Sequence, residues 1–479
     1  GGAVGRFSLD GFSFDTGPAL LHLPAVYRDL FIKTARTAGQ PRPRGAGKGT
    51  LEESVALRAV DPAVRHILPD GTVFTLPNVS RGGTVRALDA ALGAGAGRRW
   101  GRLLDRARQV WEAVRRPLLE EPLGGPAEQA ALAHDRYPPV RRWPWPRRGP
   151  ESLADIARRE LRRPGLAALL EEYALRYGHD PARAPASLVA LVYMETTFGT
   201  WYVTGGMRAL ADAVFDRCTE RGVEFRFGAE AVAFPRKDGR VAGVDLADGT
   251  RIEADAVVFG ADARLLPRLL GEEAGYGRAE PVGPPGRFTV LLALRGGRPA
   301  DAVHRTVVHA PDRSAEFAAV FAGGAPCEKP TVEVLRPDDP TLRPDDGHEA
   351  VALRAVVAAH GPAGREGAVD WTVSGLADRF AQRMIDAAEA ALPGLRERML
   401  WYQVRTPADT ERETGAPGGG VPGPALAGGE GRFLAPDNRT PVPGLYLVGG
   451  SAHPGGGLPH AGMSGAITAA LIGPAGSSA

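Results

Sequence analysis

GLYLVGGSAHPGGGLPHAGMSGAITAALI, residues 444–472, is the stretch that decides the fold of this chain. Its apolar start, 444–450, predicts a buried strand, and small residues open a helix from about 460 to 472. The glycines between them let the backbone come within contact distance of a flat ring, in part at positive φ. The start of the helix offers free N–H groups and the positive end of its dipole. A glycine-rich surface turn is the plainer interpretation, but the order of strand, glycines and helix favours a cofactor site.

Periodicity and turn residues predict strands and helices along the rest of the chain. Strands are expected at 6–16 (a hairpin turning at Asp10–Gly11), 55–60, 64–68, 72–76, 223–227, 241–254 (a hairpin), 256–262, 288–295, 303–309, 331–335 and 350–359. Helices are expected within 19–38, 84–133, 151–175, 207–221 and 376–392. Because 479 residues exceed what one core usually serves, we expect more than one lobe.

Composition excludes several classes of function. The 58 basic and 56 acidic residues give a net charge of +2, so no excess of positive charge is available to neutralise nucleic acid. Two cysteines, Cys218 and Cys327, favour a reducing cytoplasm over a disulfide-stabilised fold. No run of about 18 apolar residues predicts a membrane span. We assign no metal site.

The segment GGSAHPGGGLPHAGMSG within 444–472 resembles the C-terminal flavin-binding signature of bacterial carotenoid desaturases, in both the phytoene and the hydroxycarotenoid branches. Further blocks resemble the same family, so the likeness covers nearly the whole chain. They are GFSFDTGPALLHLPAVYRDLF (11–31), the run 176–214 that contains GGM, GVEFRFGAEAVAF (222–234) and RTPADTERETGAPGGGVPG (405–423).

The resemblance implies an α/β fold, with an FAD-binding Rossmann-like lobe that is incomplete at its N-terminus and a mixed-sheet substrate lobe with a helical cap. The FAD-binding lobe is expected to be discontinuous, from 1–75, 200–265 and 432–475. The substrate lobe is expected from 76–199 and 266–431. The family begins with a strand, a GxGxxG turn and a helix, which hold the pyrophosphate. Residues 1–2 resemble the end of that segment, and we expect the rest to be encoded upstream of Gly1.

The implied function is FAD-dependent desaturation of a carotenoid, either phytoene or a hydroxylated or partly desaturated derivative, by hydride transfer to the flavin. The implied partners are a hydrophobic polyene and oxygen or a quinone as electron acceptor. Trp143 and Trp145 among arginines suit a peripheral contact of a cytoplasmic protein with a membrane, although a proline-rich surface loop explains them equally. Alternatives are a carotenoid isomerase, a retinol saturase-like or amine-oxidase-type flavoenzyme, and a flavin-free isoprenoid-binding protein.

Candidate site residues follow from the same likeness. The candidate cofactor-binding residues are Gly1, Gly2, Asp15, Thr16, Gly17, Val232, Gly449, Gly450, Gly456, Gly462 and Met463. The candidate catalytic residues are Glu195, Asp15 and His453. Each has a structural alternative: Glu195 as an arginine-paired glutamate, Asp15 in a strand-ending turn, and His453 as a residue that bonds backbone. The candidate tunnel residues are Val192, Met194, Phe198, Trp201, Tyr202 and Phe288, with ordinary core as the alternative.

Overall fold

A mixed sheet of seven strands forms the centre of the computed structural model, which describes residues 2–35, 49–138, 152–271 and 283–474. Its strand order is β20 (Met399–Arg405), β14 (Gly286–Arg295), β17 (His348–Val357), β16 (Val332–Leu335), β15 (Arg305–Val308), β5 (Val64–Ile67) and β6 (Val73–Leu76). Only the β15–β5 pair in this sheet is parallel among the described strands. Helix α12 (Leu376–Ala388) covers one face, where Phe288 packs on Trp371 and Phe380. Phe288 therefore belongs to the core beneath α12.

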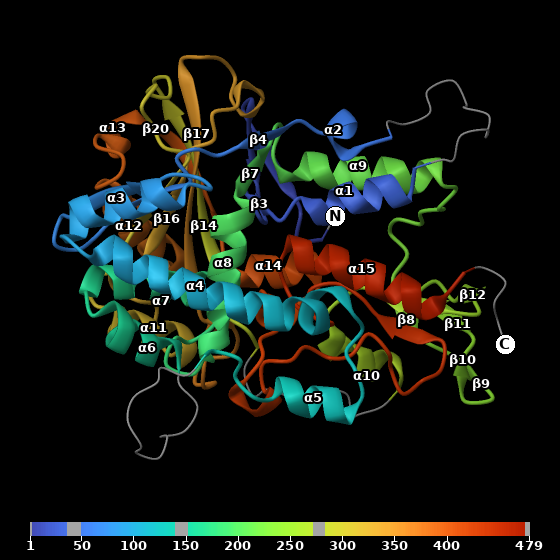
Figure 1. The fold of residues 1–479 in the computed structure, drawn as a ribbon. Helices are drawn as coiled ribbons and strands as arrows, with labels where there is room; N and C mark the ends of the chain where they lie inside the picture. The colour runs from blue at the N-terminus through green and yellow to red at the C-terminus, as the bar shows by residue number, and fades with distance from the viewer. Residues whose placement is uncertain (1, 36–48, 139–151, 272–282, 475–479) are drawn as a thin grey trace, which may run out of the picture.

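A layer of helices packs beside this sheet around Trp100 and forms the largest apolar core (Figure 1). It contains α3 (Arg81–Leu92), α4 (Ala96–Arg115), α5 (Pro126–Leu132), α6 (Leu153–Ile156), α7 (Pro164–Arg176) and α8 (Val189–Phe198). The continuous helical region predicted over 84–133 is interrupted, because Gly93 and Gly95 adopt positive φ between α3 and α4. Beyond α4 a π-helical turn, Arg116–Glu120, includes Pro117.

The glycine-rich stretch belongs to a third group of elements, to the right in Figure 1. Strand β21 (Leu445–Leu447) pairs in parallel with β13 (Val257–Phe259) and leads to α15 (Leu458–Ile472). Helices α1 (Ala25–Lys33) and α9 (Met207–Glu220) lie above α15 in this view. The small antiparallel sheets of the described residues are β1 (Arg6–Leu9) with β2 (Phe12–Asp15), β3 (Leu21–His22) with β7 (Thr200–Val203) and β4 (Leu57–Ala59), β9 (Arg236–Lys237) with β10 (Arg240–Val241), and β12 (Arg251–Glu253) with β11 (Gly243–Leu246) and β8 (Ala231–Ala233).

The predicted α/β fold with a mixed sheet is confirmed, whereas the division into two lobes stays a prediction. The hairpin at Asp10–Gly11 is confirmed, with both turn residues at positive φ. The strand predicted at 223–227 is wrong. An alternating segment becomes a strand only when a neighbour completes its hydrogen bonds, and no described strand lies beside this one. Phe225 and Phe227 instead stack 5.8 Å apart on the surface.

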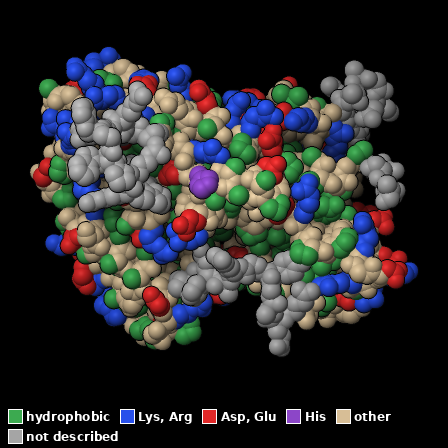
Figure 2. All heavy atoms as spheres, turned by 60° about the horizontal axis from the view of Figure 1, so that its bottom comes forward, with side chains coloured by type: hydrophobic (Ala, Val, Ile, Leu, Met, Phe, Trp, Pro, Cys, Tyr) green, Lys and Arg blue, Asp and Glu red, His purple; other side chains and the backbone are tan. Residues whose placement is uncertain are grey.

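The surface carries no large field of one sign on the face in Figure 2, where basic and acidic side chains are interspersed. This mixture agrees with the net charge of +2. None of the helices in the described ranges is both long and apolar enough to cross a bilayer. Trp143 and Trp145, on which the predicted membrane contact depends, lie outside the described residues.

Candidate active site

The glycine-rich loop 449–457 lies at the carboxyl ends of β21 and β13, where ligands of parallel α/β sheets bind. Ser464 on α15 fixes this loop: its hydroxyl donates to the His453 carbonyl at 2.8 Å and accepts from the Gly449 N–H at 3.1 Å. The buried Asn438 amide donates to the same His453 carbonyl at 2.9 Å. These buried bonds hold the loop in one shape, and the Gly449 N–H is used in doing so.

The surroundings of Gly449 and Gly450 suit a flat cofactor, because the protein's own atoms come no nearer to an added Cβ than ordinary van der Waals contact. A Cβ added at Gly449 would have its nearest neighbour at 3.7 Å, and one at Gly450 would meet only the Gly456 Cα at 3.6 Å. Crowding by the protein's own atoms therefore does not explain why position 450 is a glycine. Gly457 caps α15 without a side chain. Pro459 has no N–H and the Ala461 N–H donates to the Gly457 carbonyl, so the N–H groups of Leu458 and His460 are the ones left for a ligand. This arrangement suits the flavin of FAD.

Gly456 and Gly462 require a different explanation from the one that the sequence suggested. A Cβ at Gly456 would lie 1.8 Å from the Pro422 carbonyl oxygen, and Gly456 does not adopt positive φ. A Cβ at Gly462 would lie 2.7 Å from Cγ1 of Val26 on α1. The protein's own packing excludes side chains at both positions, so the steric argument from a ring beside Gly456 is wrong. Contact of either residue with the cofactor stays a prediction.

Asp15 links the end of β2 to the start of α9. Its carboxylate accepts the N–H of Met207 at 2.8 Å and the N–H of Arg208 at 3.3 Å, so it caps a helix that lacks a capping side chain of its own. Burial raises the pKa of Asp15, against the lowering effect of the Met207 N–H and the Arg354 guanidinium. The adjoining Gly17 packs so closely on residue 3 that a Cβ would lie 1.7 Å from the Ala3 carbonyl oxygen.

We expect Asp15→Ala to lower the free energy of unfolding by about 1–2 kcal/mol, because two N–H groups at the start of α9 lose their acceptor. Urea denaturation of the purified protein measures this loss. Asp15→Asn keeps one acceptor oxygen and should cost less. Equal stability of all three proteins would contradict the capping role.

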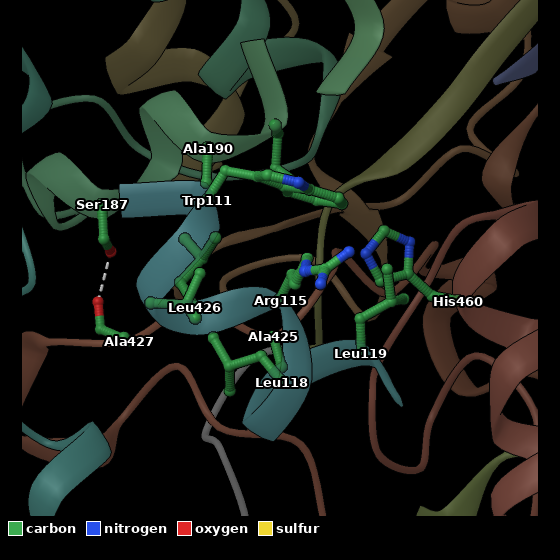
Figure 3. Close-up of a pocket in the computed structure, with 12 residues that line it drawn as sticks. Trp111, Arg115, Leu118, Leu119, Ser187, Ala190, Ala425, Leu426, Ala427 and His460 are labelled. Atoms are coloured by element: carbon green, nitrogen blue, oxygen red, sulfur yellow. Dashed lines mark hydrogen bonds between the residues drawn. The ribbon is translucent and has the colours of Figure 1, made fainter. Parts of the chain in front are cut away.

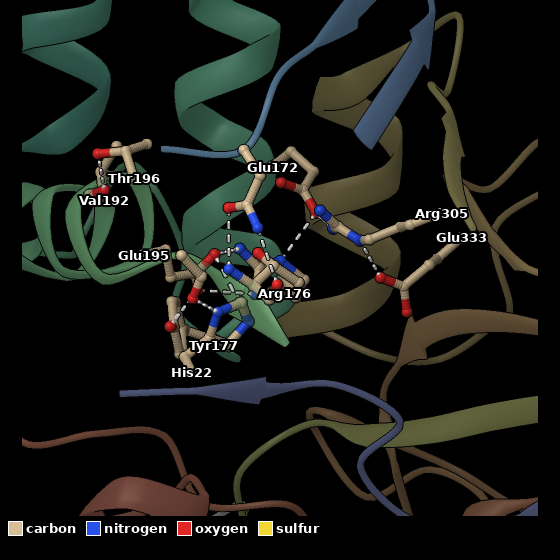
Figure 4. Close-up of polar contacts among 12 residues, drawn as sticks. His22, Glu172, Arg176, Tyr177, Val192, Glu195, Thr196, Arg305 and Glu333 are labelled. Carbon is tan, nitrogen blue, oxygen red and sulfur yellow. Dashed lines mark hydrogen bonds and ion pairs between the residues drawn. The ribbon is translucent and has the colours of Figure 1, made fainter. Parts of the chain in front are cut away.

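Glu195 lies in a buried cluster of charged and aromatic residues (Figure 4). The carboxylate accepts from both terminal nitrogens of Arg176, at 3.0 and 2.8 Å, and from the Tyr177 hydroxyl. Burial alone would raise its pKa, but Arg176 and His22 hold the pKa of Glu195 at about 2. An ionised carboxylate with these partners is a poor proton acceptor, so the geometry favours the arginine-paired interpretation. The catalytic role remains untested.

The cluster continues beyond Glu195. Arg176 also bonds Glu172, and Glu172 accepts from Arg305, which pairs in turn with Glu333. Arg176 on α7 and Glu195 on α8 are brought together by tertiary packing. The spacing of these two residues in the sequence does not predict their contact. Of the residues in this cluster, only Glu195 is a candidate site residue from the sequence.

The remaining predicted site residues are scattered. His453 is buried, its Nε2 lies 3.0 Å from the Glu121 carbonyl, and burial lowers its pKa, so it is neutral. This backbone contact is the alternative that the sequence left open. Val232 is 43% exposed on β8, and Met463 is half-buried on α15. Gly2 is exposed, Thr16 donates its N–H to the Gly5 carbonyl, and Gly1 lies outside the described residues.

Comparison with known proteins supports a flavin site. The model of the family described as flavin containing amine oxidoreductase matches residues 1–282. Hydroxyneurosporene desaturase of Rhodobacter capsulatus is 28% identical over 98% of this chain and 90% of its own. The 4,4'-diapolycopene oxygenase of a Methylomonas species is 27% identical over 98% and 90%. A putrescine oxidase with redesigned cofactor binding superposes with a TM-score of 0.61 at 12% identity, over 98% of this chain and 89% of that one, which shows the fold alone.

Proposed function

The chain belongs to the family of flavin containing amine oxidoreductases, and on this premise we propose that it is an FAD-dependent desaturase of a carotenoid. One observation carries the proposal: the similarity to hydroxyneurosporene desaturase spans 98% of the chain, including the glycine-rich loop and α15. We also propose peripheral contact with a membrane, and oxygen or a quinone as the final electron acceptor. The discontinuous FAD-binding lobe, 1–75, 200–265 and 432–475, is part of the same proposal.

When bound, FAD supplies a two-electron acceptor for the hydrogen removed from the substrate. The residues of this chain bind the cofactor and orient the elements around it. The backbone at Gly449 and Gly450 would lie against a flat ring, and the N–H groups of Leu458 and His460 at the start of α15 would be donors to its polar edge. Asp15 fixes the junction between β2 and α9. The ion pair of Glu195 and Arg176 holds α7 against α8.

Anaerobic mixing tests the proposal. The flavin-loaded protein, mixed with hydroxyneurosporene in detergent micelles, should lose its flavin absorbance and release a polyene with two fewer hydrogens, seen by chromatography and mass spectrometry. An unchanged flavin spectrum with every carotenoid would contradict the proposal. Reduction by amines instead would identify an amine-oxidase-type enzyme, and isomerisation without net reduction of the flavin would identify an isomerase.

A further inference from the structure

An apolar pocket lies between helices α4 and α8 and the start of α15 (Figure 3). Its walls come from the end of α4, the π-helical turn after it, the start of α8 and residues 425–427. The lining residues are Trp111, Val114, Arg115, Leu118, Leu119, Ser187, Ala190, Leu191, Ala425, Leu426, Ala427 and His460. The Ser187 hydroxyl already donates to the Ala427 carbonyl. His460, Arg115 and the indole N–H of Trp111 are the lining side chains with polar atoms left to offer a ligand.

His460 is the unusual member of this lining. Its side chain is 5% exposed, and its Nδ1 has no hydrogen-bond partner in the described part of the chain. Burial lowers the pKa of His460 to about 4, so the imidazole is neutral near pH 7 and can donate one hydrogen bond and accept another. Leaving a buried polar atom unpaired costs free energy, because the atom has lost its hydrogen bond to water. A ligand oxygen would remove that cost.

Arg115 adds a donor beside the imidazole. Its side chain is 48% exposed, and its nearest carboxylate, Glu120, lies 3.6 Å from Nη1. Figure 3 shows the guanidinium of Arg115 turned toward the ring of His460. The pocket therefore combines hydrocarbon walls with two neighbouring polar groups, which suits an apolar molecule with a single oxygen.

The pocket adjoins the glycine-rich loop 449–457, against which the flavin would bind. His460 is the third residue of α15, three positions after Gly457. A ligand bound by His460 would therefore lie beside the glycine-rich loop. A hydroxyl fits this imidazole best, because it can accept one hydrogen bond and donate another.

We propose that this pocket binds the hydroxyl-bearing end of a polyene and that His460 determines the preference for hydroxylated over hydrocarbon substrates. The inference rests on the proposed function and extends it to a substrate class. Hydroxyneurosporene desaturase, one of the relatives, is named for a hydroxylated polyene. A quinone carbonyl presents related chemistry, and the test separates the two.

Equilibrium binding of hydroxyneurosporene and neurosporene, followed by the shift of polyene absorbance, tests the proposal with the flavin-loaded protein. We expect the unaltered protein to bind the hydroxylated polyene about five- to tenfold more tightly, the effect of one hydrogen bond. His460→Leu should reduce this ratio to about one, and His460→Gln should restore part of it. A ratio of one in the unaltered protein, or an unchanged ratio in His460→Leu, would overturn the proposal.

Controls separate this result from general damage and from failure of the proposed function. His179→Leu removes another imidazole whose pKa burial lowers to about 4, outside the pocket lining, and should leave the ratio unchanged. A short-chain ubiquinone that displaces hydroxyneurosporene from the unaltered protein but not from His460→Leu would assign the pocket to the electron acceptor and overturn substrate binding. Desaturation is measured separately, so its absence would refute the proposed function while the binding ratio still decides the pocket.

Discussion

Replacing Glu195 by leucine should lower the free energy of unfolding by about 3–5 kcal/mol, the cost of leaving a buried charge without its partner. Both terminal nitrogens of Arg176 and the Tyr177 hydroxyl would lose their acceptor in the core between α7 and α8. Urea denaturation followed by circular dichroism measures the loss. The matched control is Asp212→Ala, which breaks the ion pair with Arg208 on the surface of α9 and should cost less than about 1 kcal/mol.

The acid dependence of stability should reveal the same ion pair. The folded protein holds the pKa of Glu195 at about 2, below its ordinary value of 4.5. The ionised carboxylate therefore stabilises the protein fully above about pH 5, and this stabilisation falls away as the pH drops toward about 2. Glu195→Gln should flatten that part of the stability curve. Loss of desaturation in Glu195→Gln with stability unchanged at every pH would instead support the catalytic role.

Local patterns explain which elements the sequence predicts correctly. Strand β21, the glycine-rich loop and α15 follow one another within 28 residues, so their order is visible in the chain itself. The hairpin at Asp10–Gly11 is equally local. Tertiary neighbours decide the cases that fail. Segment 223–227 alternates as a strand does but has no described strand beside it.

The candidate site shows the same division between local and tertiary causes. The sequence indicates that the loop before α15 needs glycines, yet the carbonyl that excludes a side chain at Gly456 belongs to Pro422. Arg176 and Glu195 meet only because α7 packs near α8. The pocket at His460 draws its walls from four separate segments. Sequence spacing carries no signal for such contacts.

Gly450→Val should abolish the retention of FAD while leaving the apoprotein as stable as before. A Cβ at Gly450 would meet only the Gly456 Cα, at the ordinary contact distance of 3.6 Å, and Gly450 does not adopt positive φ, so the apoprotein accepts a β-carbon there without strain. A ring bound against residues 449–450 would collide with the valine side chain. Overpacking of about 1–3 kcal/mol corresponds to a loss of about 5- to 150-fold in affinity. Flavin released on denaturation, measured against protein concentration, gives the bound fraction.

Two further glycine variants make the Gly450 result specific to the cofactor. Gly456→Ala places a Cβ 1.8 Å from the Pro422 carbonyl, so it should destabilise the apoprotein itself. Gly465→Ala lies on α15 with no atom within 4 Å of the added Cβ. It should leave the flavin content unchanged and alter the free energy of unfolding by no more than about 1 kcal/mol. If Gly450→Val retains normal flavin, the ring does not lie against residues 449–450, and the cofactor must approach α15 from another side. If it loses flavin only together with apoprotein stability, the substitution acts on the loop rather than on the ring.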